Sequence, residues 1–365
     1  MIDATNGLQG IIAADTAISM VDGENGRLVY RGHSAQQLAL NHSFEEVAHL
    51  LWYGHLPSES ELFALSEKLD AARQLPEYVV RIIKSLPKSA DMMSVLRTAV
   101  SAMDATSWPP SVNDAIRFTA AFPVIIACRS ASLSGLPTPA PKSDLGHVAN
   151  YLYMLTGRLP DIAHVRALEA YLILAMEHGM NASTFAGRVA GSTEADLACS
   201  LTASLGAMKG PLHGGAPSQV MSMLEEIGSV EKAEPWLRSA LESGKKLMGF
   251  GHRVYRTADP RARALKTVVS HHAGDDELFR LATEVEDIAT RLLSEYKPGR
   301  HLYANVEFWA AVVLQAIYLP KPLYTPTFSV GRVVGWTAHA LEQSSNNRII
   351  RPQSRYVGPL PDAVE

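Results

Sequence analysis

Apolar residues recur every three or four positions along most of the chain, which is the spacing of one face of a helix. The clearest pattern covers residues 278–292, where the apolar side chains keep a period near 3.6. Similar patterns predict helices over residues 145–156, 161–190, 194–208, 218–228 and 328–343. The chain is therefore expected to be mainly α, with about fifteen or more helices.

Residues 10–32 carry the only clear β pattern. Two short apolar runs, 17–21 and 27–31, flank residues 22–26, which have the sequence DGENG. Asp, Asn and Gly favour turns, because the side chains of Asp and Asn bond to nearby backbone and Gly tolerates positive φ. The pattern predicts a small N-terminal β-hairpin.

Several helix ends and loops are also indicated. Ser43 is expected to be an N-cap, with Glu46 at the capping-box position. Residues 106–113 and 134–143 are rich in Pro and Ser and predict loops between helices. Residues 210–217, with the sequence GPLHGGAP, form the strongest interruption in the second half of the chain.

The composition agrees with a helical fold and narrows the function. The chain has 365 residues, 47% hydrophobic and 19% charged, so it can bury a large core without a disulfide or metal. A net charge of −4 gives no basic field for nucleic acid. The N-terminus lacks signal-peptide features, and there is no apolar run of about 18 residues. We expect a cytoplasmic protein that does not span a membrane.

The cysteines and most histidines show no metal-binding spacing. The sequence contains neither H-E-x-x-H nor C-x-x-C. Cys128 and Cys199 lie in apolar segments and are expected to be two reduced, buried thiols. His42, His49 and His55 are interpreted as surface or helix-end residues. We therefore expect no metal site.

Three histidines lie in segments that do not resemble ordinary core helix. His178 is in EHGMNAS, His213 in GPLHGGAP and His252 in MGFGHRVYRTADPR. Glycine lies near each of them, and glycine lets the backbone approach a ligand closely. We interpret these three histidines as candidates for a functional site.

Three arginines suggest a site for a small polyanion. Asp259, Pro260 and Arg261 have the order of an N-cap followed by a first helical turn. An arginine there opposes the helix dipole, so Arg261 either holds an anion or is a solvated surface residue. Arg332, in the apolar segment VGRVVGW, needs a carboxylate partner from the protein or from a ligand. Arg351 follows an apolar pair and precedes a proline.

Glu307 is the only acid in the apolar segment YANVEFWAA, near the start of a predicted helix. It is either a helix N-terminal glutamate favoured by the dipole or a general base in a dry pocket. Burial would raise its pKa, whereas the helix dipole would lower it.

The chain resembles the citrate synthase family. Six motifs occur in the family's order and spacing over residues 7–358: EHGMNAS, GPLHGGAP, MGFGHRVYRTADPRA, YANVEFWAA, SVGRVVGW and RPQSRYVG. The resemblance implies a two-domain helical fold that works as a homodimer. Residues 1–215 and 323–365 would form a large domain, and residues 216–322 a small one.

The resemblance also implies a reaction and the residues that carry it. Acetyl-CoA would condense with oxaloacetate, and the thioester would be hydrolysed to citrate and CoA, with no permanently bound cofactor. His213 would polarise the thioester carbonyl, His252 would donate a proton to the oxaloacetate carbonyl, and Glu307 would be the base. The family's usual base is Asp. The implied oxaloacetate ligands are His178, Arg261, Arg332 and, from the neighbouring subunit, Arg351.

The co-substrate of such an enzyme is a coenzyme A thioester, and one loop is similar to the family's CoA-binding loop. Its residues are Lys246, Leu247, Met248, Gly249, Phe250, Gly251 and Arg253. Three alternatives remain open: a 2-methylcitrate synthase using propionyl-CoA, a catalytically weak homologue that binds CoA or carboxylates in regulation, and a metal-dependent hydrolase. One methylene is worth only about 1–3 kcal/mol in a pocket, so the sequence does not separate the two synthases.

Overall fold

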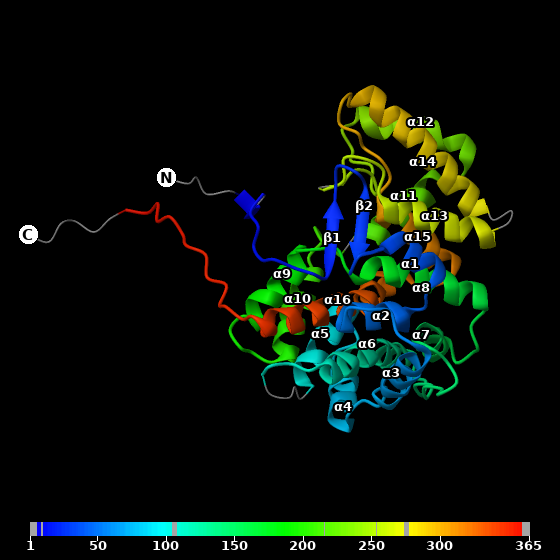
Figure 1. The fold of residues 1–365 in the computed structure, drawn as a ribbon. Helices are drawn as coiled ribbons and strands as arrows, with labels where there is room; N and C mark the ends of the chain where they lie inside the picture. The colour runs from blue at the N-terminus through cyan, green and yellow to red at the C-terminus, as the bar shows by residue number, and fades with distance from the viewer. Residues whose placement is uncertain are drawn as a thin grey trace, which may run out of the picture.

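The computed structural model describes residues 6–8, 10–103, 108–214, 216–252, 254–273 and 277–359. Within these ranges the chain forms sixteen α-helices, two short 3-10 helices (Asn6–Leu8 and Lys321–Leu323) and one small sheet (Figure 1). The expected mainly α fold is confirmed.

The sheet contains the predicted hairpin and a third short strand. Asp22 closes the hairpin turn, since its side chain accepts hydrogen bonds from Asn25 N and from the Arg27 guanidinium. The third strand has only two residues, both exposed, and therefore leaves no hydrophobic pattern in the sequence. The order is antiparallel throughout, β1 (Ser19–Asp22), β2 (Arg27–Tyr30) and β3 (His33–Ser34).

Eleven of the helices pack into one group, which we call the main body. The long helix α16 lies at its centre and contacts α2, α5, α6, α8, α9 and α10. The main body consists of α1 (Ala35–Asn41), α2 (Phe44–Tyr53), α3 (Glu59–Ala71), α4 (Glu77–Ser85), α5 (Met92–Ala102), α6 (Val112–Leu133), α7 (His147–Thr156), α8 (Ile162–Met176), α9 (Ala182–Gly191), α10 (Leu197–Met208) and α16 (Tyr324–Ser345).

The other five helices form what we call the outer group, at the top of Figure 1. Helices α13 and α15 of this group pack against α8 of the main body. The outer group consists of α11 (Ala216–Ile227), α12 (Val230–Glu242), α13 (Pro260–Ala273), α14 (Glu277–Tyr296) and α15 (Val306–Ala316).

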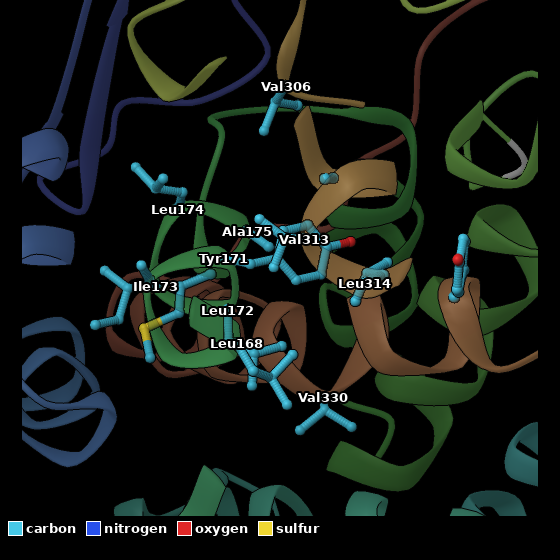
Figure 2. Packing of buried hydrophobic residues seen from close by; sticks show 14 of the residues in the cluster. Leu168, Tyr171, Leu172, Ile173, Leu174, Ala175, Val306, Val313, Leu314 and Val330 are labelled. Carbon is cyan, nitrogen blue, oxygen red and sulfur yellow. The ribbon is translucent and has the colours of Figure 1, made fainter. Parts of the chain in front are cut away.

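Helix α8 is the element on which the two groups meet. Figure 2 shows its buried side chains, among them Leu168 and Tyr171, beside Val313 of α15 and Val330 of α16. All four are buried, and burying an aliphatic side chain such as Leu168, Val313 or Val330 stabilises a fold by about 1.5–3 kcal/mol. This packing holds α15 and α16, which carry Glu307 and Arg332, against α8, after which His178 follows.

The single helix predicted over residues 161–190 is wrong. Helix α8 ends at Met176 and α9 begins at Ala182, because Gly179 has a φ of +60° that helix cannot contain. The Asn181 side chain then caps α9 by accepting a hydrogen bond from Thr184 N. The break places His178 in a bend between two helices.

Other predicted ends agree with the structure. Ser43 and Glu46 form the expected capping box at the start of α2. Residues 134–143 lie in the connection between α6 and α7 as a loop. Of the loop predicted over 106–113, residues 108–111 precede α6, whereas residues 106 and 107 lie outside the described part of the chain. For residues 112 and 113 the prediction is wrong, because the Ser111 cap starts the helix at Val112.

Two expectations about burial are wrong. Cys128 is buried, but Cys199 is exposed, because its position on α10 faces outward; both thiols are free. His49 is not a surface residue, since it is 3% exposed and stacks on Tyr53 with 4.4 Å between ring centroids. His55 is exposed as expected.

One helix of the described residues, α6, is long and apolar enough to cross a membrane by length and composition alone. Of its most apolar window, 72% is buried inside the fold. Asp114 and Arg129 are also buried on this helix. Such burial is typical of the core helix of a soluble protein.

Candidate active site

A cavity of about 800 Å³ lies where the hairpin, the α8–α9 bend and the outer group meet. It brings together six of the seven residues predicted to be catalytic or to bind oxaloacetate. These residues come from three connections and three helices that lie far apart in the sequence. The six are His178, His213, His252, Arg261, Glu307 and Arg332.

Tyr255 packs against both His178 and His252. The rings of His178 and His252 lie edge to face with 5.4 Å between centroids. The Tyr255 hydroxyl lies 3.3 Å from His178 Nε2, and its ring lies 4.7 Å from that of His252. Tyr255 is missed by the sequence analysis, although it stands within the motif that contains His252.

The backbone fixes the hydrogen position on His252. Its Nδ1 accepts hydrogen bonds from Val254 N and Tyr255 N, both at 3.0 Å. Burial, with the nearby Arg261 guanidinium, lowers the pKa of His252 to about 4, so the ring is neutral near pH 7. A neutral ring whose Nδ1 accepts must carry its hydrogen on Nε2, which can be donated to a ligand oxygen.

His213 is held by a hydroxyl that the sequence analysis did not single out. Its Nε2 lies 2.7 Å from Ser183 Oγ, which also accepts a hydrogen bond from Trp336 Nε1 at 3.1 Å. Burial and the charge of Arg332 lower the pKa of His213 to about 4. In this structure the Ser183 hydroxyl donates its proton to Asn181 Oδ1 at 2.8 Å. If Ser183 turns that proton to Nε2 when a ligand binds, the neutral ring carries its own hydrogen on Nδ1 and can donate it.

Arg261 is not a solvated surface residue, since it is 5% exposed. Asp259 holds its guanidinium with two hydrogen bonds, Nε to Oδ1 at 3.1 Å and an Nη to Oδ2 at 2.8 Å. Asp259 also accepts hydrogen bonds from the backbone N of Arg261 and of Val306, each at 3.0 Å. Asp259 therefore positions Arg261 and joins the start of α13 to the start of α15, where Glu307 lies.

Arg332 is buried, at 2% exposed, and forms no ion pair with a carboxylate of the described residues. Its Nε donates to the backbone oxygen of Ala175, and its guanidinium lies over the Phe328 ring at 4.6 Å. A buried guanidinium needs a carboxylate to offset its lost hydration. Arg332 lines the cavity, so its guanidinium is in a position to meet a ligand carboxylate.

Glu307 lies in the first turn of α15, where Asn305 Oδ1 accepts a hydrogen bond from its backbone N at 3.0 Å. Burial raises the pKa of Glu307 to about 7, although Arg261 and Arg332 act to lower it. Desolvation therefore outweighs the effect of both cations on this pKa. A carboxyl with this pKa is suited to take up a proton near neutral pH.

Glu177 binds the backbone of the bend between α8 and α9 and was not predicted from the sequence. It is fully buried, and one of its carboxylate oxygens accepts a hydrogen bond from Gly179 N at 2.5 Å. The same oxygen lies 3.1 Å from His339 Nε2, and the other ring nitrogen of His339 bonds to Arg188. Glu177 thereby holds the turn that carries His178.

The predicted CoA loop is attached to the segment before Glu307. Gly251 N donates to Tyr303 O and Asn305 N donates to Gly249 O, each at 2.8 Å. In this loop Lys246 is exposed and Met248 is half-buried, whereas Leu247 and Phe250 are buried and offer only backbone to a ligand. Arg253 lies outside the described residues. None of residues 246–251 lines the cavity described above.

Arg351 is the one predicted substrate ligand that the structure places apart from the others. It is exposed and lies in the extended segment after α16, which runs away from the main body (Figure 1). It does not line the cavity.

The fold is helical, and the cavity combines neutral histidines, a carboxyl group with a raised pKa and two buried arginines. The family model "Citrate synthase, C-terminal domain" matches residues 7–353. The chain therefore belongs to the citrate synthase family, as the resemblance predicted.

Known relatives cover almost the whole chain. Citrate synthase 2 of Bacillus subtilis is 40% identical over 98% of this chain and 96% of its own length. A 2-methylcitrate synthase of Mycobacterium tuberculosis is 39% identical over 98% of this chain and 91% of its own length. Citrate synthase of Thermoplasma acidophilum has been solved in a ternary complex with carboxymethyl coenzyme A and oxaloacetate. It is 31% identical over 100% of this chain and 98% of its own, with a TM-score of 0.90.

Proposed function

We propose that this protein condenses acetyl-CoA with oxaloacetate and hydrolyses the product to citrate and free CoA. The observation that carries the proposal is the meeting of Glu307, His213 and His252 with Arg261 and Arg332 in one cavity. A coenzyme A thioester is the co-substrate, and the complex of the Thermoplasma relative supports this choice.

The proposed steps use side chains that line the cavity. Glu307 removes a proton from the thioester methyl group while His213 donates a hydrogen bond to the thioester oxygen, where negative charge develops. The new carbon nucleophile attacks the ketone carbon of oxaloacetate. His252 gives its Nε2 proton to the ketone oxygen, which becomes the hydroxyl of the product. Water then cleaves the thioester and releases CoA.

Three cavity residues are proposed to hold oxaloacetate. Guanidinium groups bind carboxylates with paired, charge-assisted hydrogen bonds. Arg332 has no carboxylate partner among the described residues, and Arg261 is kept in place by Asp259. His178, beside His252, can donate to a further oxygen of the same substrate.

We infer that residues 216–322 move against residues 1–215 and 323–365 to close the site. The hairpin turn supports this, since Arg256 N donates to Gly23 O at 2.9 Å. A Cβ on Gly23 would lie 2.3 Å from the Val254 backbone oxygen, so only glycine allows this approach. Closure would keep water out until condensation is complete.

The Glu177→Gln variant is expected to raise the KM for oxaloacetate more than it lowers kcat. An amide presents one acceptor oxygen and no charge to Gly179 N and His339, so the bend that carries His178 loosens. Loss of a hydrogen bond to a buried charged group costs about 1.5–3 kcal/mol, or roughly 10- to 150-fold in affinity. Steady-state kinetics with each substrate varied in turn would show it; a pure kcat effect would contradict the positioning role.

A homodimer in which Arg351 reaches the neighbouring site is part of the proposal. The Arg351→Ala variant is expected to raise the KM for oxaloacetate by roughly tenfold or more, because one charge-assisted contact is lost. Arg348→Ala, a change at an exposed arginine three residues earlier, serves as the control. Sedimentation should show the dimer in both variants. Unchanged KM in Arg351→Ala would remove it from the site.

We also propose a cytoplasmic location, which the two free thiols support because such thiols are typical of reducing compartments. Cell fractionation would test it.

The Mycobacterium relative favours one second candidate, a 2-methylcitrate synthase that uses propionyl-CoA. The same residues would serve both reactions, since the two thioesters differ by one methylene. Comparison of kcat/KM for acetyl-CoA and propionyl-CoA, at saturating oxaloacetate, decides between them. The proposal predicts a preference for acetyl-CoA, and a clear preference for propionyl-CoA would replace it with the second candidate.

A further inference from the structure

Two histidines and a glutamate form a cluster outside the candidate active site, at the connection between α2 and α3. His49 lies in α2, His55 follows that helix, and Glu61 lies in the first turn of α3. One ligand atom from each residue lies within 4.8 Å of the other two. Within the described part of the chain, this is the one group of three such residues with this geometry.

The ring of His49 is oriented as metal-binding histidines are. Its Nδ1 lies 3.0 Å from the backbone oxygen of His55. A carbonyl oxygen only accepts, so Nδ1 carries a hydrogen, and the neutral form of the ring has its lone pair on Nε2. Histidines that bind metals usually donate their other ring nitrogen in this way. Burial and the stacking on Tyr53 restrict the ring further.

The carboxylate of Glu61 is also fixed before any ligand binds. Its Oε2 accepts hydrogen bonds from Ser58 N and Ser58 Oγ, both at 2.8 Å, in the capping box of α3. Its Oε1 lies 3.1 Å from His55 Nε2. Hydrogen bonds from Ser58 and His55 lower the pKa of Glu61 to about 2, so it is anionic near pH 7. A metal ion would take the place of the proton shared by His55 and Glu61.

We propose that His49, His55 and Glu61 bind one divalent transition-metal ion of the zinc type. Two neutral imidazoles and a carboxylate form a common donor set for Zn²⁺, with water as the fourth ligand. Ligand atoms about 2.0–2.2 Å from the metal lie closer together than they do now, and the exposed His55 side chain is free to turn inward. The spacing of five residues between successive ligands matches no local motif, so the sequence analysis could not find it. The ion ties the end of α2 to the start of α3.

The test is Zn²⁺ binding by the purified full-length protein, freed of metal with EDTA and dialysed. We expect isothermal titration to show one equivalent in the wild type that disappears in His55→Ala. Glu61→Gln should weaken it at least tenfold, while glutamine keeps the capping box intact. His42→Ala is the matched control, because His42 pairs with Glu46 at 3.0 Å in the same way without a third ligand. His42→Ala should bind like the wild type.

The deciding quantity is the difference between the wild type and His55→Ala, because the active-site histidines can also take Zn²⁺. Equal stoichiometry and affinity in the two proteins would overturn the proposal. An equal loss of Zn²⁺ binding in His42→Ala and His55→Ala would also overturn the proposal, since such a result would indicate weak surface binding. A Zn²⁺-dependent rise in the thermal midpoint that is absent in His55→Ala would support it. These measurements do not depend on turnover, so they stand apart from the proposed function.

Discussion

Replacement of Glu307 by Gln is expected to lower kcat by roughly 10³-fold, since general base catalysis contributes about 10²–10⁴. The amide has nearly the shape of the carboxyl but cannot accept the methyl proton. The neighbouring arginines stay in place, so the KM for oxaloacetate should change little. Steady-state measurement of CoA release provides both constants.

The control for this variant is Glu59→Gln, which changes an exposed acid in the first turn of α3 and should leave kcat unchanged. A Glu307→Gln enzyme with more than about a tenth of the wild-type kcat would exclude Glu307 as the base. Glu307→Asp gives a second check. If the pocket is built for Glu, the shorter side chain moves the base by about 1 Å and costs up to roughly 10²-fold.

The pH dependence should report the same group. Glu307 must be ionised to act as a base, and its pKa is raised to about 7. The value of kcat/KM should therefore rise with pH through about 7 and level off above it. His213 and His252, whose pKa values are lowered to about 4, are neutral throughout this range and add no second transition. A profile that is flat between pH 6 and 8, a window of about one unit on each side of that pKa, would contradict this assignment.

Replacement of Arg332 by Met is expected to lower kcat/KM for oxaloacetate by roughly 10²–10³-fold. Loss of one partner from a buried charge pair costs about 2–5 kcal/mol. Without substrate, Arg332 is a buried cation with no carboxylate partner among the described residues. Methionine has a similar length and no charge, so the cost of burying an unpaired cation is removed. The thermal midpoint should therefore be unchanged or higher.

Arg129 is the matched control, because it is another fully buried arginine, at 1% exposed. Its guanidinium donates to the backbone oxygens of Ile83, Leu86 and Pro87, and none of these residues lines the active-site cavity. Arg129→Met should therefore lower the thermal midpoint and leave the KM for oxaloacetate unchanged, the opposite pattern to Arg332→Met. If both variants lost only stability, Arg332 would be a structural residue.

Much of the site could be predicted because its residues break local rules. Glycines near histidines, and single charges such as Glu307 and Arg332 in apolar helices, are unusual within a few residues of sequence. Such local exceptions indicated six residues that the structure places around one cavity. The helical fold followed from periodicity, and the hairpin from the turn residues after Val21.

The missed features depend on contacts between distant segments. The break after Met176 was not predicted, because apolar residues continue on both sides of it and the Glu177 side chain holds the turn from within the core. Ser183 bonds to the His213 ring and Tyr255 packs against the His252 ring, and folding alone brings Ser183 and His213 together. The burial of His49 likewise depends on how α2 packs, which a local pattern does not encode.

The most direct test of the account is a turnover assay with acetyl-CoA and oxaloacetate in the presence of EDTA. The wild-type protein should release free thiol and form citrate in equal amounts, and Glu307→Ala should do neither above background. Activity in EDTA would also exclude the metal-dependent hydrolase. A folded wild-type protein that binds both substrates but releases no more thiol than Glu307→Ala would contradict the proposed enzyme and favour a regulatory homologue.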